Sequence, residues 1–165
     1  MKIAGLVAQT RFESPLGPLT AAVTNKGLAG LWFDGQAHHP GPLAVPENPR
    51  QPVLAQASRQ LAAYWKGGRV KFEVPLDLQG TDFQRKVWRA LLRIQAGTTS
   101  TYAAIAARAG SPAAVRAAGA AIGRNPVCII IPCHRVLGRD GSLTGYAGGL
   151  ERKMSLLKRE GALRL

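Results

Sequence analysis

Cysteine is scarce in this sequence, which has only two among 165 residues, Cys128 and Cys133. Five residues of extended chain span about 16 Å, which is beyond the reach of a disulfide bond. Two cysteines and three scattered histidines also match no spacing of a structural zinc site. We therefore expect two free thiols in a reducing compartment, and no bound metal.

Long apolar runs are absent as well. No segment approaches the roughly eighteen apolar residues of a membrane-spanning helix, which argues against a membrane partner. The chain starts with one lysine and a six-residue apolar run before Gln9, and this run is too short for a signal peptide. We expect a protein that stays inside the cell, in the cytoplasm.

Acidic residues are few: 9 Asp and Glu stand against 22 Lys and Arg, for a net charge of +13. The imbalance is uneven, since residues 1–80 carry 8 basic and 5 acidic residues, whereas residues 81–165 carry 14 and 4. A strongly basic half is typical of a protein with a polyanionic partner, most commonly nucleic acid. The alternative is a charge that serves only solubility.

The pattern of apolar residues changes near Gln79–Gly80, so we expect one domain over residues 1–79 and another over 80–165. In the first domain, residues alternate as in strands over three segments: 19–24, 28–33 and 70–78. A short turn joins the first two and predicts a hairpin. The Pro- and Gly-rich stretch 34–52 predicts a loop, and helical spacing follows over 53–66. This is an α/β domain.

The second domain is predicted to be mainly helical. Apolar spacing and capping signals predict four helices: 83–94, with Thr81 or Asp82 as its cap, and 102–109, 112–122 and 150–160. Ser111 precedes Pro112, which is typical of an N-cap followed by the first helical residue. Two helices separated by a tight turn at Gly110 have the outline of a helix-turn-helix.

The third of these helices, "PAAVRAAGAAI", is rich in alanine around a single long side chain, Arg116. A surface of small residues allows close approach to DNA while one cation projects. The alternative is a helix with small residues that packs against its neighbours.

The stretch "IIIPCHRV" predicts a buried strand that ends at Cys133 and His134. A free thiol is only a few per cent thiolate near neutral pH, and an imidazole that accepts its proton makes it a nucleophile. Adjacent residues of a strand point to opposite sides, so the pair needs a turn or a bridging water. Pro132 can break the strand. The dipeptide alone is weak evidence, since a buried cysteine is usually a small apolar residue.

The surrounding motifs are more specific. They are "TYAAIA" and "RAAGAAIG" within 101–123, "RNPVCIIIPCHRV" at 124–136 and "GRDGSLTGYAGGLERKMSLLKREG" at 138–161, with "SPLGPLTAAVT" and "GLAGLWFDG" in the first half. With these motifs the chain resembles the O6-alkylguanine-DNA alkyltransferases. The resemblance implies a ribonuclease-H-like α/β domain followed by a winged helix-turn-helix-like domain.

The resemblance also implies a reaction that needs no cofactor. Cys133 would take the alkyl group from O6 of guanine in DNA, and from O4 of alkylated thymine, and keep it as a thioether. One protein would thus be consumed per lesion. His134 would draw the thiol proton through a water, Glu160 would orient the imidazole, and Asn125 would tie the active-site turn together. Without the resemblance to the family, Glu160 would be interpreted as an ordinary acidic residue of a terminal helix, and Asn125 would be interpreted as a turn residue.

The base pocket implied by the resemblance uses Tyr102, which would donate to the leaving guanine. It also uses main-chain groups near Val136 and in the "GYAGG" loop, at Tyr146, Ala147 and Gly148. Ala147 is serine in some members, so a contact to O6 there has to come from the backbone N–H. Taken alone, a tyrosine that opens a helix is more often a core residue.

The implied partner is double-stranded DNA with an alkylated guanine, bound by a monomer. The target atom lies inside the duplex, so the base must flip out. Arg116 would fill the vacated stack from a helix in the minor groove, with Ala114 and Val115 beside it. The basic residues of the second half are candidates for phosphate contacts, among them Arg85, Arg89, Arg124 and Arg135.

Two positions and two rival functions complete the expectations. Gln95 stands where the family usually has proline, and Cys128, where some members have proline, is expected to be a buried structural thiol. One rival is a non-catalytic protein that binds alkylated bases, against which Cys133 argues. The other is a Cys-His hydrolase, against which the basic second half argues.

Overall fold

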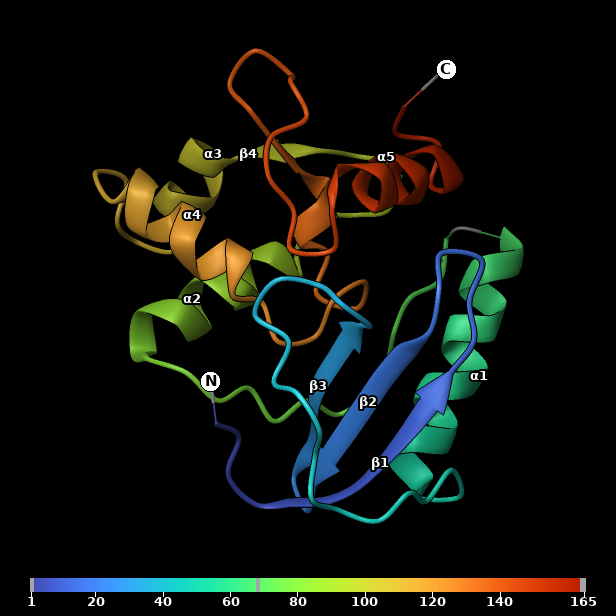
Figure 1. Ribbon diagram of the computed structural model, residues 1–165. Coiled ribbons are helices and arrows are strands. Elements are labelled where there is room, and N and C mark those ends of the chain that lie inside the picture. Colours follow the sequence, from blue (N-terminus) through green and yellow to red (C-terminus); the bar gives the residue numbers. More distant parts are fainter. Residues whose placement is uncertain (1, 68, 164–165) are drawn as a thin grey trace. The chain divides into compact units, whose positions relative to one another are not determined.

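The computed structural model describes residues 2–67 and 69–163. The chain divides into two compact units, one made of residues up to Gln79 with Pro126–Cys128, the other of Gly80–Asn125 with the residues from Ile129 onward. The chain therefore returns to the first unit for three residues, which a simple division at residue 79 does not include. The mixed α/β class is confirmed (Figure 1). No helix among the described residues has both the length and the apolar character to cross a membrane.

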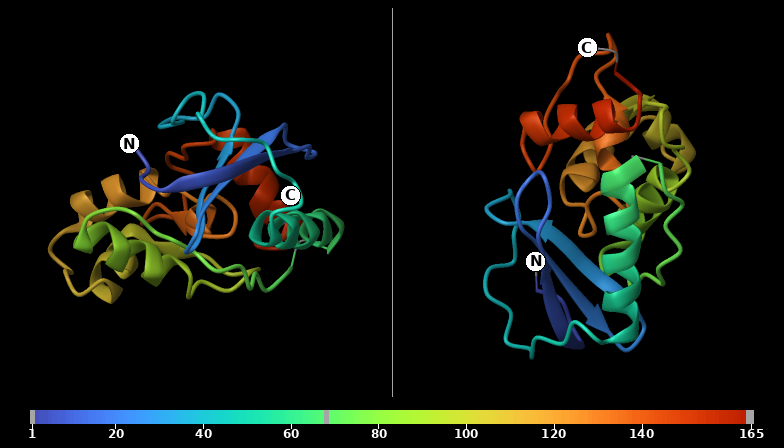
Figure 2. Two further views of the ribbon diagram at one scale, coloured as in Figure 1. Left: turned by 90° about the horizontal axis from the view of Figure 1, so that it is seen from below. Right: turned by 90° about the vertical axis from the view of Figure 1, so that its right-hand side faces the viewer.

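The first unit is a three-stranded antiparallel sheet with one helix. Its elements are β1 (Leu6–Phe12), β2 (Leu19–Thr24), β3 (Gly27–Phe33) and α1 (Pro52–Gly67), and the strand order is β1-β2-β3. The predicted hairpin is confirmed, with Thr24 paired to Gly27, whereas β1 adds a strand to those predicted. The helix α1 packs on the sheet (Figure 2), and its buried residues include Leu54, Leu61 and Tyr64.

The strand expected over residues 70–78 is wrong. This segment runs beside β3, but the two share a single bridge, between Leu28 and Leu76. The Leu28 N–H donates to the Pro75 carbonyl at 2.8 Å, and the Asp77 N–H donates to the Leu28 carbonyl at 2.9 Å. Pro75 has no N–H of its own, so the ladder cannot continue through it.

The second unit carries the helices that follow α1 (Figure 1). Its elements are α2 (Asp82–Leu91), β4 (Ser100–Thr101), α3 (Tyr102–Arg108), α4 (Val115–Gly123), η1 (Cys133–Arg135), β5 (Val136–Leu137) and α5 (Leu150–Arg159). The helices α2, α3 and α4 pack on one another. Trp88 is fully buried among them and its Nε1 donates to the Ala121 carbonyl at 2.8 Å. Thr81 caps α2 as predicted, in a capping box with Gln84.

The helix predicted from Pro112 begins later, at Val115, and Ser111 is not its cap. Ser111 instead closes the preceding helix, because its N–H donates to the Ala106 carbonyl at 3.0 Å after Gly110 has taken a left-handed φ of 85°. This is a helix C-terminal motif. A separate turn follows, closed by the Ala114 N–H on the Ser111 carbonyl at 2.9 Å, so that Ser111 ends α3 and cannot begin α4.

Candidate active site

Cys133 lies on a tight turn, so the strand expected from Ile129 onward is wrong. Ile129 has a φ of 69°, a left-handed conformation that breaks a strand and is unusual for a β-branched residue. Pro132 has φ −83° and ψ 62°, and the Cys133 N–H donates to the Ile131 carbonyl at 2.8 Å, which makes an inverse γ-turn. Cys133–Arg135 continue as a single 3-10 turn.

Asn125 reaches the same turn from the end of α4. Its side chain is buried, and its Nδ2 donates to the Ile131 carbonyl at 2.8 Å. That carbonyl therefore accepts two hydrogen bonds, one from Asn125 and one from the backbone of Cys133. Asn125 follows directly after Arg124, the C-terminal cap of α4, and so ties this helix to the turn that carries the thiol.

His134 and Glu160 form a buried pair. The His134 Nε2 lies 2.8 Å from Oε2 of Glu160, and neither side chain is exposed to solvent. Glu160 sits at the C-terminal cap of α5, 26 residues from His134 along the chain. The other ring nitrogen, Nδ1, is buried and has no hydrogen-bond partner in the part of the chain that the structure describes.

A buried cation, Arg135, also binds Glu160. The Arg135 Nε donates to Oε1 of Glu160 at 2.8 Å, and a terminal nitrogen donates to Oε2 at 3.1 Å. The other terminal nitrogen donates to the Ile94 carbonyl at 2.5 Å. Both Glu160 oxygens therefore accept from Arg135, and one of them also faces His134.

These contacts determine the charge of each group. Burial alone raises the pKa of Glu160, but the hydrogen bonds and charges of His134 and Arg135 outweigh it and lower the pKa to about 2. Burial lowers the pKa of His134, against the opposing effect of Glu160. Glu160 is therefore ionised and the imidazole neutral near pH 7. Neutral His134 can donate from Nε2 to the carboxylate, which leaves its lone pair on Nδ1.

The thiol is protonated in this environment. Burial raises the pKa of Cys133 to about 11, although a hydrogen bond from Asn125 and the positive charge of Lys153 oppose the rise. At neutral pH the thiolate fraction is therefore very small, and a base has to remove the proton when the thiol reacts. The Nδ1 atom of the adjacent His134 is chemically suited to that task.

Tyr102 lies against the loop between β5 and α5. It opens α3, and its hydroxyl accepts a hydrogen bond from the Thr144 Oγ1 at 2.9 Å. Tyr146, in the same loop, has its ring centroid 6.5 Å from that of His134, edge to face. Val136 is buried at the start of β5, and its N–H donates to the Cys133 carbonyl. Two further predicted pocket residues, Ala147 and Gly148, are half-buried in this loop.

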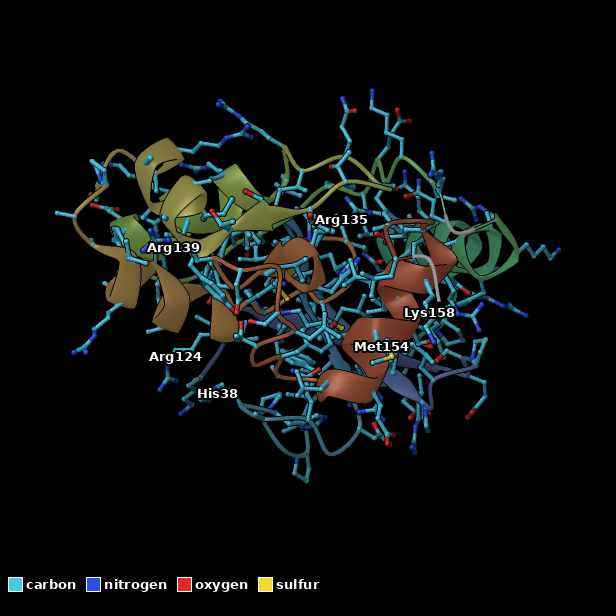
Figure 3. The ribbon with its side chains drawn as sticks, turned by 90° about the horizontal axis from the view of Figure 1, so that it is seen from above. His38, Arg124, Arg135, Arg139, Met154 and Lys158 are labelled. Carbon is cyan, nitrogen blue, oxygen red and sulfur yellow. The ribbon has the colours of Figure 1, made fainter. Side chains whose placement is uncertain are left out.

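The predicted DNA-contacting residues lie along α4. Val115 and Arg116 are exposed in its first turn, and Ala114 is its half-buried N-cap. The opposite face packs inward through Ala118, Ala121 and Ile122, so the small residues serve packing as well as an open outer surface. Arg124 is exposed and extends outward just beyond the last turn (Figure 3).

Comparison with known proteins identifies the family. Residues 82–162 match the DNA binding domain of 6-O-methylguanine DNA methyltransferase, and residues 7–78 match its ribonuclease-like domain. A methylated-DNA-protein-cysteine methyltransferase of Methanosarcina barkeri is 49% identical over 149 residues, which cover 90% of this chain and 93% of that protein. One from Mycolicibacterium paratuberculosis is 47% identical over 148 residues, 90% of this chain and 88% of that protein.

The crystal structure of Mycobacterium tuberculosis OGT in complex with DNA is also similar, with a TM-score of 0.85 and 44% identity over 94% of each chain. The chain belongs to the 6-O-methylguanine DNA methyltransferase family. The resemblance stated from the motifs is confirmed, as are the fold class, the methyltransferase activity and the function in DNA repair.

One phosphate contact expected for this methyltransferase is wrong. Arg135 is only 7% exposed, and its guanidinium is bonded to Glu160 and to the Ile94 carbonyl. A side chain held in this way has no freedom to reach a DNA phosphate. Sequence alone does not indicate this burial, because an arginine on a basic chain is normally solvated. Arg85 is partly held as well, by Asp82 and by the Gly80 carbonyl.

Lys153, a buried residue of α5, lies within the motif at 138–161 but received no role from it. Its Nζ donates to the carbonyls of Thr144 at 2.8 Å and of Gly145 at 3.3 Å. Burial lowers the pKa of Lys153 to about 8, and the electrostatic interaction with Cys133 opposes this shift. A signal was present: Lys153 lies three and four residues before the buried Leu156 and Leu157, on the apolar face of an amphipathic helix.

No three His, Cys, Asp or Glu side chains gather as a metal site within residues 2–67 and 69–163. The two cysteines are buried, and neither belongs to a disulfide bond among the described residues. Cys128 belongs to the first unit, where its N–H donates to the Leu31 carbonyl at 3.0 Å. Cys133 belongs to the second unit with His134 and Glu160, and its surroundings contain the acid–base groups.

Proposed function

We propose that this methyltransferase repairs O6-alkylguanine in DNA by moving the alkyl group to the sulfur of Cys133, once per protein molecule. The observation that carries the proposal is the protonated, buried thiol next to His134, whose Nε2 is held by Glu160 and whose Nδ1 is left to act as a base. A nucleophile, a base and an orienting carboxylate are the parts that a displacement at carbon requires.

In the reaction step, His134 takes the thiol proton through a bridging water and the thiolate attacks the alkyl carbon. A sulfur–carbon bond forms as the carbon–O6 bond breaks, and the electron pair of that bond passes to the guanine. The imidazolium is stabilised by Glu160 at 2.8 Å. No step of the proposed reaction cleaves the thioether, so the protein is consumed. The same displacement applies to the alkyl group on O4 of thymine.

The departing guanine gains negative charge and needs a proton or a strong hydrogen bond. In our proposal Tyr102 supplies it, because a phenol hydroxyl can donate in a partly buried site. Its bond with Thr144 places that hydroxyl at the loop that carries Tyr146. Three groups line the remaining edges of the base in this proposal: Val136, Ala147 and Gly148.

The guanine reaches the thiol by flipping out of the duplex. The helix α4 would enter the minor groove, with Arg116 in the vacated stack, Ala114 and Val115 against the groove, and Arg124 on a phosphate. Exposure of Arg116 and Arg124 supports these roles. A monomer suffices, since one copy of the second unit holds both α4 and the thiol. The thiol must stay reduced, which favours the cytoplasm.

The test of this function uses duplex DNA with a radiolabelled methyl group on O6 of guanine. We expect the label to move to Cys133 and to stop at one methyl per protein, and Cys133→Ser to abolish the transfer. Cys128→Ser is the matched control, because it changes the other buried thiol and should transfer normally. Label that stays on the DNA would indicate a lesion-binding protein, and label released to water with turnover would indicate a hydrolase; either result contradicts the proposal.

The flipping role of Arg116 predicts a loss that depends on the substrate. Arg116→Ala is expected to slow methyl transfer from duplex DNA by about tenfold or more, since unstacking costs a few kcal/mol that the wedge offsets. Transfer from the free O6-methylguanine base should be unchanged, because no stack has to be opened. Single-turnover rates with the two substrates measure the difference. Equal losses on both would remove this role from Arg116.

A further inference from the structure

The Glu160 carboxylate binds two side chains: an imidazole, which can gain or lose a proton, and a guanidinium, which is always charged. Its Oε2 faces the His134 Nε2 at 2.8 Å, while Arg135 spans both oxygens at 2.8 and 3.1 Å. The Glu160 and His134 side chains are fully buried, and Arg135 is nearly so. A buried carboxylate needs a compensating positive charge. Here Arg135 supplies that charge permanently, because a guanidinium does not lose its proton in proteins.

The permanent cation decides what His134 has to do. Without Arg135, the negative charge of Glu160 would be balanced by a proton, held either by the carboxyl group itself or by His134 as imidazolium. A protonated Glu160 would donate to Nε2 and leave the ring hydrogen on Nδ1, so Nδ1 would have no lone pair for the thiol proton. An imidazolium donates from both nitrogens and has no lone pair, so it cannot accept the proton of Cys133. With Arg135 in place the carboxylate is already neutralised, and His134 needs to offer only one N–H.

We propose that Arg135 is a positioning residue that keeps the His134 imidazole uncharged, with its lone pair on Nδ1, by neutralising and clamping Glu160. This inference rests on the proposed function, in which His134 takes the thiol proton. It assigns to Arg135 a part in alkyl transfer in place of the phosphate contact expected from the sequence. Arg135 itself touches neither the thiol nor the alkyl group.

The geometry of the clamp requires arginine. One guanidinium donates to two carboxylate oxygens and also to the Ile94 carbonyl at 2.5 Å. Three segments are thereby joined: the 3-10 turn of Cys133–Arg135, the chain just after α2, and the C-terminal cap of α5. A lysine ammonium is a point charge and cannot reproduce the parallel fork. It can, however, preserve the charge.

The charged groups around His134 shift its pKa in both directions. Those that face it are Glu160 and Lys153 from α5, Cys133 and Arg135 from η1, and Tyr146 from the loop before α5. The charges of Arg135 and Lys153 both lower the pKa of His134, and Glu160 raises it. Lys153 is bonded to Thr144 and Gly145 rather than to Glu160, so it cannot replace Arg135 as the partner of the carboxylate.

The experiment measures the protonation of His134 independently of the rate of methyl transfer. His134 is followed by ¹⁵N NMR of the ring nitrogens during a pH titration, and single-turnover methyl transfer from O6-methylguanine duplex DNA is measured over the same pH range. The variants are Arg135→Met, Arg135→Lys and the double variant Arg135→Met/Glu160→Gln. Arg11→Met is the control, because it removes the same charge from an exposed pair with Asp34 in the first unit.

For Arg135→Met we expect the titration of His134 and the acid limb of the rate to move upward together by about one pH unit or more. Arg135→Lys should keep the wild-type inflection with a lower rate, because the charge remains and the fork is lost. The double variant should move the inflection back down, since the uncompensated carboxylate is gone. Arg11→Met should behave as the wild type.

A rate that falls equally at every pH, with an unmoved His134 titration, would overturn the inference and leave Arg135 a structural role only. If Arg135→Met does not fold, Arg135→Gln supplies the neutral side chain with two N–H donors left for Glu160, and the same shift is required of it. A wild-type protein that transfers no methyl group would defeat the proposed function. The NMR titration would still decide the role of Arg135.

Discussion

Replacing His134 with asparagine is expected to slow methyl transfer at pH 7 by about 10² to 10⁴-fold, which is the factor by which a positioned base usually raises a reaction rate. Asparagine retains an N–H that can donate to Glu160 but cannot take a proton from the thiol. Because burial raises the pKa of Cys133 to about 11, almost no thiolate exists at pH 7 without assistance. The loss should therefore appear in the chemical step and not in DNA binding.

The same raised pKa predicts a partial recovery with pH. In His134→Asn the thiolate forms only by titration, so its fraction should rise about tenfold per pH unit until the pH approaches 11. The rate of the variant should then climb about a hundredfold between about pH 7 and about pH 9. Wild-type protein should change little, because its base is already neutral above the lowered pKa of His134.

Single-turnover rates across this range check the prediction, with DNA affinity measured in parallel. His39→Asn in the first unit is a suitable control, since its ring contacts Trp32 and no group of the second unit is involved. A His134→Asn protein that reacts as fast as wild type at pH 7, or whose rate does not rise with pH, would show that the thiol loses its proton by another route.

Replacing Glu160 with leucine is expected to lower the free energy of unfolding by about 3 to 5 kcal/mol. The change leaves the Arg135 guanidinium buried without its carboxylate, and an uncompensated buried charge is far more costly than an absent ion pair. Arg135→Met/Glu160→Leu should regain most of the loss, because apolar side chains then fill the space of both ions.

Urea unfolding of the full chain measures these differences. Asp34→Leu is the matched control: it breaks the exposed pair with Arg11, and such pairs are worth about 1 kcal/mol or less. If Glu160→Leu cost no more than Asp34→Leu, the buried cluster would not contribute to stability as its geometry requires.

Acid should weaken the wild-type protein through the same cluster. The pKa of Glu160 is lowered from 4.5 to about 2 in the folded protein, so the ionised carboxylate stabilises the fold above about pH 4.5. As the pH falls from about 4.5 to about 2, roughly 3 kcal/mol of this contribution is lost. The lowered pKa of His134 acts in the same direction, because the unfolded imidazole takes up a proton first. Glu160→Gln should flatten the stability profile over this window.

Several features of this protein follow from local sequence alone. The β2–β3 hairpin and the helices α1, α2, α3 and α5 occur where periodicity and capping signals predict them, because their apolar residues recur with the period of the element that buries them. The concentration of basic charge in the second half, and the motifs around Cys133, were also sufficient to identify the family.

Tertiary contacts decided the rest. Three isoleucines before Pro132 have the composition of a strand, yet Ile129 is left-handed, since the turn is held by Asn125 and the Ile131 carbonyl. Arg135 is expected on a solvated surface, as basic residues usually are, but it is buried. Burial of a cation depends on a partner distant in sequence, and for Arg135 that partner is Glu160, 25 residues away. The local sequence does not reveal which distant residue will be the partner. Only the folded structure shows that this arginine acts together with His134, the base that takes the thiol proton.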